Sequence, residues 1–141
     1  MSLGRSVPLK PGGRLRAKPY RKAGTRAALV LLLDILCSRY VRARDGRCVI
    51  CSSTYDLQCG HYWKRATHAV RWDTTNCNAL CKGCNGRDNE NHDPYSFALM
   101  RIYGSDEVEA LRERRYSGKR FSETEMLAMA AEFKRKMKEL D

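Results

Sequence analysis

Two pairs of cysteines with the spacing C-x2-C constrain the fold of this chain more than any other feature. The pairs are Cys48/Cys51 and Cys81/Cys84. Thiolates bind Zn2+ tetrahedrally, and two such knuckles bring four sulfurs to one ion while closing a loop that a small core could not hold alone. The sequence therefore predicts one structural zinc, held by these four residues at the centre of the fold.

Three further cysteines lie outside the knuckles. The total of seven is odd, which does not suit the evenly paired disulfides of a secreted protein. Cys37 falls within an apolar helical stretch, so we expect it in the core. The roles of Cys59 and Cys77 stay open, because Cys77 lies four residues before Cys81 and offers an alternative zinc ligand.

Positive charge is concentrated at the N-terminus. The formal net charge is +11, and the first 33 residues hold eight basic residues and no acidic one. Residues 1–24 also contain prolines and glycines, so we expect a disordered, flexible arm. Such an arm either keeps the protein in solution or follows a polyanion such as DNA. Its candidate phosphate contacts are Arg14, Arg16, Lys18, Arg21 and Lys22.

The remaining residues predict one folded domain over 25–141 without a membrane partner. Hydrophobic residues make up 43% of the chain, enough for a modest core. No run of about 18 apolar residues could span a bilayer. The apolar stretch 27–37 is interrupted by Asp34 and is not followed by a small-residue cleavage site, so it does not suit a signal peptide. We expect a cytoplasmic protein.

The apolar periodicity divides this domain into three parts. Residues 25–44 predict an N-terminal helix with one apolar face, formed by Leu29, Leu32, Leu33, Leu36 and Tyr40. Residues 45–92 contain the knuckles, with a hairpin that begins near Cys48 and has its second strand over 55–63. Residues 93–141 predict three helices. We expect Asp93, Ser105 and Ser122 to cap them, with Pro94 in the first turn and a capping box between Ser122 and Glu125.

Three polar residues lie between and directly after the cysteine pairs, in the order His, Asn, Asn. His61 lies between the two pairs, Asn76 follows it, and Asn85 comes directly after the last cysteine. This order resembles the HNH, or His-Me finger, nucleases in their H-N-N variant. The resemblance implies an α+β fold with a small, zinc-stapled ββα-metal core, similar to a treble clef and flanked by helices. In such a core the three side chains meet on one side of the zinc.

The flanking residues point to one family among these nucleases. From about Asp45 to the C-terminus, the pattern with Gly60-His61-Tyr62, Arg71-Trp72-Asp73, Asn91 and Pro94-Tyr95 is similar to the NinG/Rap family of lambdoid phage recombination nucleases. The likeness implies a structure-specific DNA endonuclease, acting in a bacterial host on displacement loops and Holliday-type junctions. A recombinase is then a candidate partner. Symmetric cutting of a four-way junction would favour a homodimer.

The resemblance also implies a role for each site residue. Phosphodiester hydrolysis needs a base that accepts a proton from water near neutral pH, which suits the imidazole of His61. Asn85 would be a ligand of one catalytic Mg2+ or Mn2+, and Asn76 would fix the loop that carries the histidine. Arg65 and Arg71 would hold flanking phosphates, since a guanidinium matches phosphate oxygens.

One position departs from the pattern. Many HNH nucleases have an aspartate just before the catalytic histidine as a second metal ligand, and this chain has Gly60 there. The alternative ligands are Asp73, Asp88, Asn89, Asn91 and His92, of which Asn91 has the best positional match. The missing acid also supports a second hypothesis, a non-catalytic zinc-bearing DNA-binding module or recombination adaptor. A third is a zinc-dependent protein-interaction domain.

Overall fold

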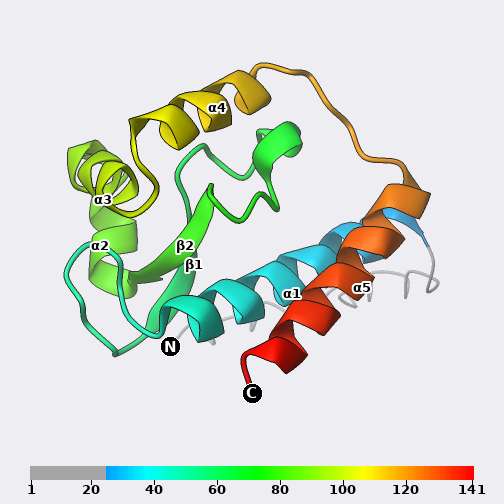
Figure 1. The fold of residues 1–141 in the computed structure, drawn as a ribbon, viewed down its shortest axis with the longest axis horizontal. Helices are drawn as coiled ribbons and strands as arrows, with labels where there is room; N and C mark the ends of the chain where they lie inside the picture. Colours follow the sequence, from blue (N-terminus) through cyan, green and yellow to red (C-terminus); the bar gives the residue numbers. More distant parts are fainter. Residues whose placement is uncertain (1–24) are drawn as a thin grey trace, which may run out of the picture.

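The computed structural model describes residues 25–141 and contains, over that range, five α-helices, one short 3-10 helix and a two-stranded antiparallel sheet (Figure 1). The predicted arm, with its five candidate phosphate contacts, lies outside the described residues. The mixed helical and strand composition is as predicted. In chain order the elements are α1 (Arg26–Asp45), β1 (Leu57–His61), η1 (His68–Val70), β2 (Cys77–Cys81), α2 (Lys82–Arg87), α3 (Asp93–Tyr103), α4 (Ser105–Arg115) and α5 (Glu123–Glu139).

Helix α1 begins and ends where the sequence predicts, within one residue. The Thr25 hydroxyl accepts a hydrogen bond from the Ala28 amide at 3.3 Å, which caps the first turn. Gly46 ends the helix with a φ of +64°, a left-handed conformation that glycine adopts without strain. Helix α1 buries one apolar face, which includes Leu33 and Cys37, and leaves Leu31 and Ile35 exposed on the other.

The predicted hairpin is wrong in its pairing. Residues 48–54 form a turn instead of a strand, because the Ser52 amide bonds back to the Cys48 carbonyl and folds the knuckle onto itself. The strand over 57–61 instead pairs with β2, in a register that sets Leu57 opposite Cys81 and His61 opposite Cys77. Helix α2 follows β2 directly, so the described chain contains two antiparallel strands and then a helix.

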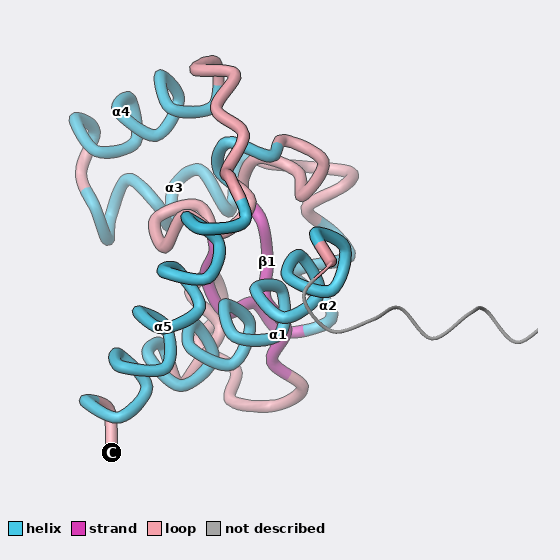
Figure 2. The backbone as a smooth tube through the Cα atoms, turned by 90° about the vertical axis from the view of Figure 1, so that its right-hand side faces the viewer, coloured by secondary structure: helices cyan, strands magenta, loops and turns pink. Residues whose placement is uncertain are grey.

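Two apolar clusters pack on the sheet. Figure 1 shows α1 and α5 on one side of the strands and α3 and α4 on the other, and Figure 2 shows the same backbone from the side. On one side α1 packs on both strands and α5 packs along α1, with Leu33, Cys77 and Phe133 in the shared cluster. On the other side Leu80 of β2 packs in a second cluster that includes Tyr95 of α3. β2 is thus largely buried, whereas β1, which ends at His61, is only partly buried.

The three predicted C-terminal helices are confirmed, with two changes at their starts. Asp93 and Ser105 are the first helical residues of α3 and α4 instead of their caps. The capping box of α5 is present as predicted: the Ser122 hydroxyl accepts from the Glu125 amide at 3.1 Å, and the Glu125 carboxylate accepts from the Ser122 amide at 2.7 Å. Helices α3 and α4 pack apart from α5, which returns to α1 (Figure 1).

Among residues 25–141, no helix combines the length and the apolar character needed to cross a bilayer.

Candidate functional site

The four knuckle cysteines come together in space. Cys48 and Cys51 lie in the turn before β1, Cys81 ends β2, and Cys84 lies in α2. Their four sulfurs all lie within 4.8 Å of one another, and the Cys51 and Cys81 Sγ atoms are 3.7 Å apart. A tetrahedral ion with Zn–S bonds of about 2.3 Å sets its sulfurs roughly 3.8 Å apart, so the cluster fits zinc.

The surroundings lower the pKa of Cys48 and raise that of Cys84. Burial raises the pKa of the Cys48 thiol, but hydrogen bonds from the Cys51, Cys81 and Ile50 backbone outweigh this effect and lower it to about 7. The Cys84 amide donates to Cys81 Sγ at 3.4 Å, as in a metal knuckle. Burial and the neighbouring thiols raise the pKa of Cys84 to about 12. A cation bound by all four sulfurs would displace the protons that crowd the metal-free cluster.

A groove of about 990 Å3 runs beside this cluster, between α1, the end of β1 and α2. Two of the predicted site residues, His61 of β1 and Asn85 of α2, line it together. Five basic side chains line the same groove, and Asp34 is the one acidic side chain among them. The basic residues are Arg39, Arg42, Lys64, Arg65 and Lys82. The predicted phosphate contact Arg65 therefore lies in the groove, within a strongly cationic lining.

A backbone contact orients the ring of His61. Its Nε2 lies 2.9 Å from the Arg71 carbonyl oxygen. A carbonyl only accepts hydrogen bonds, so a neutral imidazole in this position carries its proton on Nε2 and keeps the lone pair on Nδ1. Within the described residues Nδ1 has no hydrogen-bond partner. His61 therefore lines the groove with an oriented ring and one nitrogen without a partner.

Arg71 itself lies in a different place from the one its predicted role requires. Its guanidinium donates to the Asp34 carboxylate at 2.6 and 2.9 Å, and Trp72 Nε1 donates to the same carboxylate at 2.8 Å. Burial raises the pKa of Asp34, but these hydrogen bonds outweigh it and hold that pKa below its ordinary value. Arg71 is not among the groove-lining residues. Its side chain anchors the loop on α1, and its carbonyl positions His61.

Asn76 is buried directly before β2 and ties the loop between the strands together. Its Oδ1 accepts from the Trp63 amide at 2.7 Å, and its Nδ2 donates to the Trp63 and Val70 carbonyls at 3.0 Å. These bonds join both ends of the segment that follows His61. The position is the one that a loop-fixing role needs, and Asn76 does not line the groove.

Asn85 keeps one polar atom free for a ligand. Its Nδ2 donates to Gln58 Oε1 at 2.9 Å, which leaves the carbonyl Oδ1 without a partner among the described residues. An amide oxygen is a suitable ligand for Mg2+. Of the five alternative second ligands predicted from the sequence, Asn89 alone lines the groove with Asn85 and His61, and its Oδ1 accepts from Lys64 Nζ at 2.9 Å.

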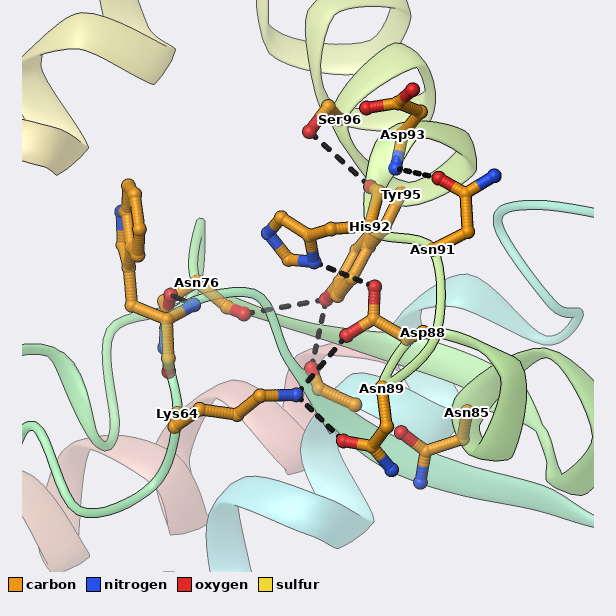
Figure 3. Close-up of polar contacts among 12 residues, drawn as sticks. Lys64, Asn76, Asn85, Asp88, Asn89, Asn91, His92, Asp93, Tyr95 and Ser96 are labelled. Carbon is orange, nitrogen blue, oxygen red and sulfur yellow. Dashed lines mark hydrogen bonds and ion pairs between the residues drawn. The ribbon is translucent and has the colours of Figure 1, made fainter.

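The other four alternatives have partners elsewhere. Asn91, the best positional match, accepts from the Asp93 amide at 3.1 Å and lies at the start of α3, outside the groove (Figure 3). Asp88 binds His92 Nδ1 at 2.7 Å and Lys64 Nζ at 3.4 Å. Asp73 is paired with Arg114 at 2.7 Å. The structure thus separates Asn91 from Asn85, the two tentative ligands of one catalytic ion.

Gly60, where the usual aspartate is missing, has no room for a side chain. A Cβ built on it would lie 2.4 Å from Leu80 Cδ1, and Leu80 is fully buried. The Gly60 carbonyl also accepts from the Tyr95 hydroxyl at 2.8 Å. An acid at position 60 would point into the α3-side core, so this fold excludes it as a metal ligand.

We expect Gly60→Ala to lower the free energy of unfolding by about 1–3 kcal/mol, because an extra methyl group in a packed core forces its neighbours apart. Urea unfolding with zinc present measures this change. Gly86→Ala is the matched control: nothing lies within 4 Å of a Cβ at Gly86, which is inside α2, so alanine should be neutral or stabilising there. Equal stability of the Gly60 variant and the wild type would contradict the packing argument.

Sequence reasoning missed much of the groove. Arg39, Arg42, Gln58, Lys64 and Lys82 line it and were not singled out. Ile35, Arg39 and Arg42 have helical spacing on the face of α1 opposite its buried residues, and this signal could have found part of the groove. The contact between Asp34 and Arg71 joins residues 37 positions apart, and no local pattern predicts it.

Comparison with known proteins gives one match. A family model described as the bacteriophage lambda NinG protein matches residues 20–141. The match extends beyond the predicted resemblance, which began near Asp45, and includes all of α1. No curated protein and no solved structure matches the chain.

Proposed function

We propose, from the premise that this chain belongs to the family of the bacteriophage lambda NinG protein, that it is a metal-dependent endonuclease acting on branched DNA. The observation that carries the proposal is the shared groove. One wall holds an oriented histidine and an asparagine with a free oxygen, and five basic side chains surround them. This combination suits hydrolysis of a polyanion.

The basic side chains would bind the phosphates on either side of the scissile bond. Arg39 and Arg42 lie on α1, while Lys64 and Arg65 lie on the loop after β1, so they border the groove from different elements. Contacts to phosphates carry no information about the base sequence, and no described helix offers an evident face for contacts to base edges. Recognition would then depend on the path of the DNA strands, as branched DNA requires.

His61 would act as the general base. Its Nδ1 would take a proton from a water molecule in the groove, while the Nε2–H bond to the Arg71 carbonyl holds the ring in place. The resulting imidazolium would be stabilised by that carbonyl. The ion pair between Arg71 and Asp34 keeps the carbonyl from moving during the step.

Asn85 and Asn89 are the groove residues that would hold a catalytic Mg2+ or Mn2+. Asn85 offers a free amide oxygen, and the Asn89 oxygen, which accepts from Lys64 Nζ at 2.9 Å, would become free when Lys64 binds a phosphate. Two neutral ligands fit a cation that keeps several waters and takes its remaining ligands from the phosphate. Such a cation stabilises the charge that develops on the leaving oxygen. The structural zinc would have no part in the reaction.

The deciding experiment incubates the purified full chain with linear, displacement-loop and four-way DNA of matched sequence, with zinc held constant and Mg2+ present or omitted. We expect cleavage of the branched substrates only with Mg2+. Binding without cleavage would replace the nuclease proposal with the adaptor hypothesis. Equal cleavage of linear DNA would contradict the preference for branches.

The groove also predicts a salt-dependent affinity for DNA. Each neutralised phosphate releases condensed counterions, which adds about 0.9 to the slope of log affinity against log salt. We expect Arg39→Ala and Lys82→Ala each to lower that slope by about this amount, measured by fluorescence anisotropy on a four-way junction. Arg135→Ala is the control, because Arg135 lies on α5 and is paired with Glu132 and Glu139. An unchanged slope in both groove variants would remove the groove as the DNA-binding surface.

A further inference from the structure

The three cysteines outside the knuckles form a second cluster. Cys37 comes from α1, Cys59 from β1 and Cys77 from β2, and their sulfurs all lie within 4.8 Å of one another. The cluster contains none of the knuckle residues, so Cys77 is not an alternative ligand for the first ion. All seven cysteines of the chain therefore belong to one of two sulfur clusters.

We propose that this cluster is a second zinc site, in which the three thiolates hold the ion between α1 and the sheet. Three thiolates form a soft donor set that selects zinc or a similarly thiophilic cation over Mg2+. Zinc sites with three protein ligands keep one position open for water. The ligand count thus differs from that of the closed, four-sulfur site.

The three thiols are buried enough to enclose an ion, and one side of the cluster is open for the ion to enter. Cys37 and Cys77 are 1% and 0% exposed, and Cys59 is partly exposed. Cys37 and Cys59 also line the cationic groove, so an ion can reach the sulfurs from that side. The fourth coordination position would face the groove.

A guanidinium lies beside the three sulfurs. The guanidinium of Arg44 interacts with both Cys37 and Cys59 and donates to the Cys77 carbonyl at 3.1 Å. Zinc with three thiolates would have a net charge of −1, and Arg44, which is also paired with Asp45 at 2.7 Å, lies beside it.

The site would stabilise the wall of the groove that carries His61. Cys59 lies two residues before His61 on β1, and Cys77 lies directly opposite His61 on β2. An ion bound here would join α1 to both strands at that point. The inference does not depend on the proposed nuclease activity, because it concerns metal content.

The test is the zinc content of the full chain, dialysed against a zinc-buffered solution and measured by elemental analysis. We expect two zinc ions per chain in the wild type and one in both Cys37→Ala and Cys59→Ser, with helical circular dichroism retained. Cobalt substitution gives a second readout, since the thiolate-to-cobalt charge-transfer band should weaken in the same two variants.

Two results would overturn the proposal. One is a single zinc per wild-type chain under saturating zinc, which would make the cluster a group of free core thiols. The other is two zinc ions in the wild type and in both variants alike, which would place the second ion elsewhere. Loss of nuclease activity alone would not bear on the inference.

Discussion

Replacing His61 with alanine is expected to lower the cleavage rate of branched DNA by about 10²–10⁴-fold, the usual contribution of a positioned general base. Zinc content and affinity for branched DNA should stay near their wild-type values, since the imidazole is neither a zinc ligand nor one of the basic side chains proposed to bind phosphates. The measurement is single-turnover cleavage of a four-way junction at saturating enzyme, which separates the chemical step from binding.

His68→Ala is the matched control for this prediction. His68 packs against Trp72 and Phe121 outside the groove, so its loss should leave the cleavage rate nearly unchanged. Asn85→Ala should also lose activity but recover part of it at high Mn2+, because a missing ligand weakens the affinity for the ion and leaves the base intact. A His61 variant that cleaves as fast as the wild type under Mg2+ would show that the base lies elsewhere.

Local chemistry made much of this fold predictable. Helix α1 begins after Thr25 and ends at Gly46, and α3 ends at Gly104, which has a φ of +82°. Ser122 and Glu125 form the capping box that starts α5. These boundaries were predictable because caps and turns depend on residues within a few positions. The pairing of β1 was not predictable in this way. Its partner lies 16 to 24 residues further on, and sheet register depends on which faces become buried.

In the candidate site, too, features that depend on nearby residues were predictable and those that depend on distant packing were not. Short spacing was sufficient to group the four knuckle cysteines, and the resemblance to the HNH nucleases singled out His61, Asn76 and Asn85. The carbonyl that orients His61 belongs to Arg71, whose side chain is held by Asp34 from α1. A cationic residue in a loop looks equally suited to bind phosphate or to form an ion pair, and only the position of α1 distinguishes the two. The trio of Cys37, Cys59 and Cys77 depends on that same packing.

The four knuckle cysteines lie in parts of the chain whose own secondary structure is short. Within the described residues the sheet has two strands of five residues each, and a two-stranded sheet is marginal in water. Helix α2 has six residues, too few to persist alone. The cluster joins the turn before β1, the end of β2 and α2, so it closes the wall of the groove that carries Asn85.

Cys84→Ser is therefore expected to release zinc and unfold the central module. Apparent free energies of structural zinc binding are about 10–16 kcal/mol, comparable to the total stability of a domain of about 5–15 kcal/mol, so losing this ion leaves little net stability. The measurements are zinc content, near-ultraviolet circular dichroism of the module's aromatic side chains and thermal unfolding.

Cys37→Ala separates this effect from the loss of a buried thiol. It removes a buried sulfur from α1, and with it the proposed second ion, but leaves all four knuckle ligands in place, so that variant should keep its tertiary signal and a cooperative transition. The contrast follows from the positions of the two residues: Cys84 holds α2 to the sheet through the ion, whereas Cys37 lies in a helix that also packs through Leu33 and Val41. A zinc-free Cys84 variant with the same melting temperature as the wild type would show that the hydrogen bonds and apolar clusters hold the module without a metal.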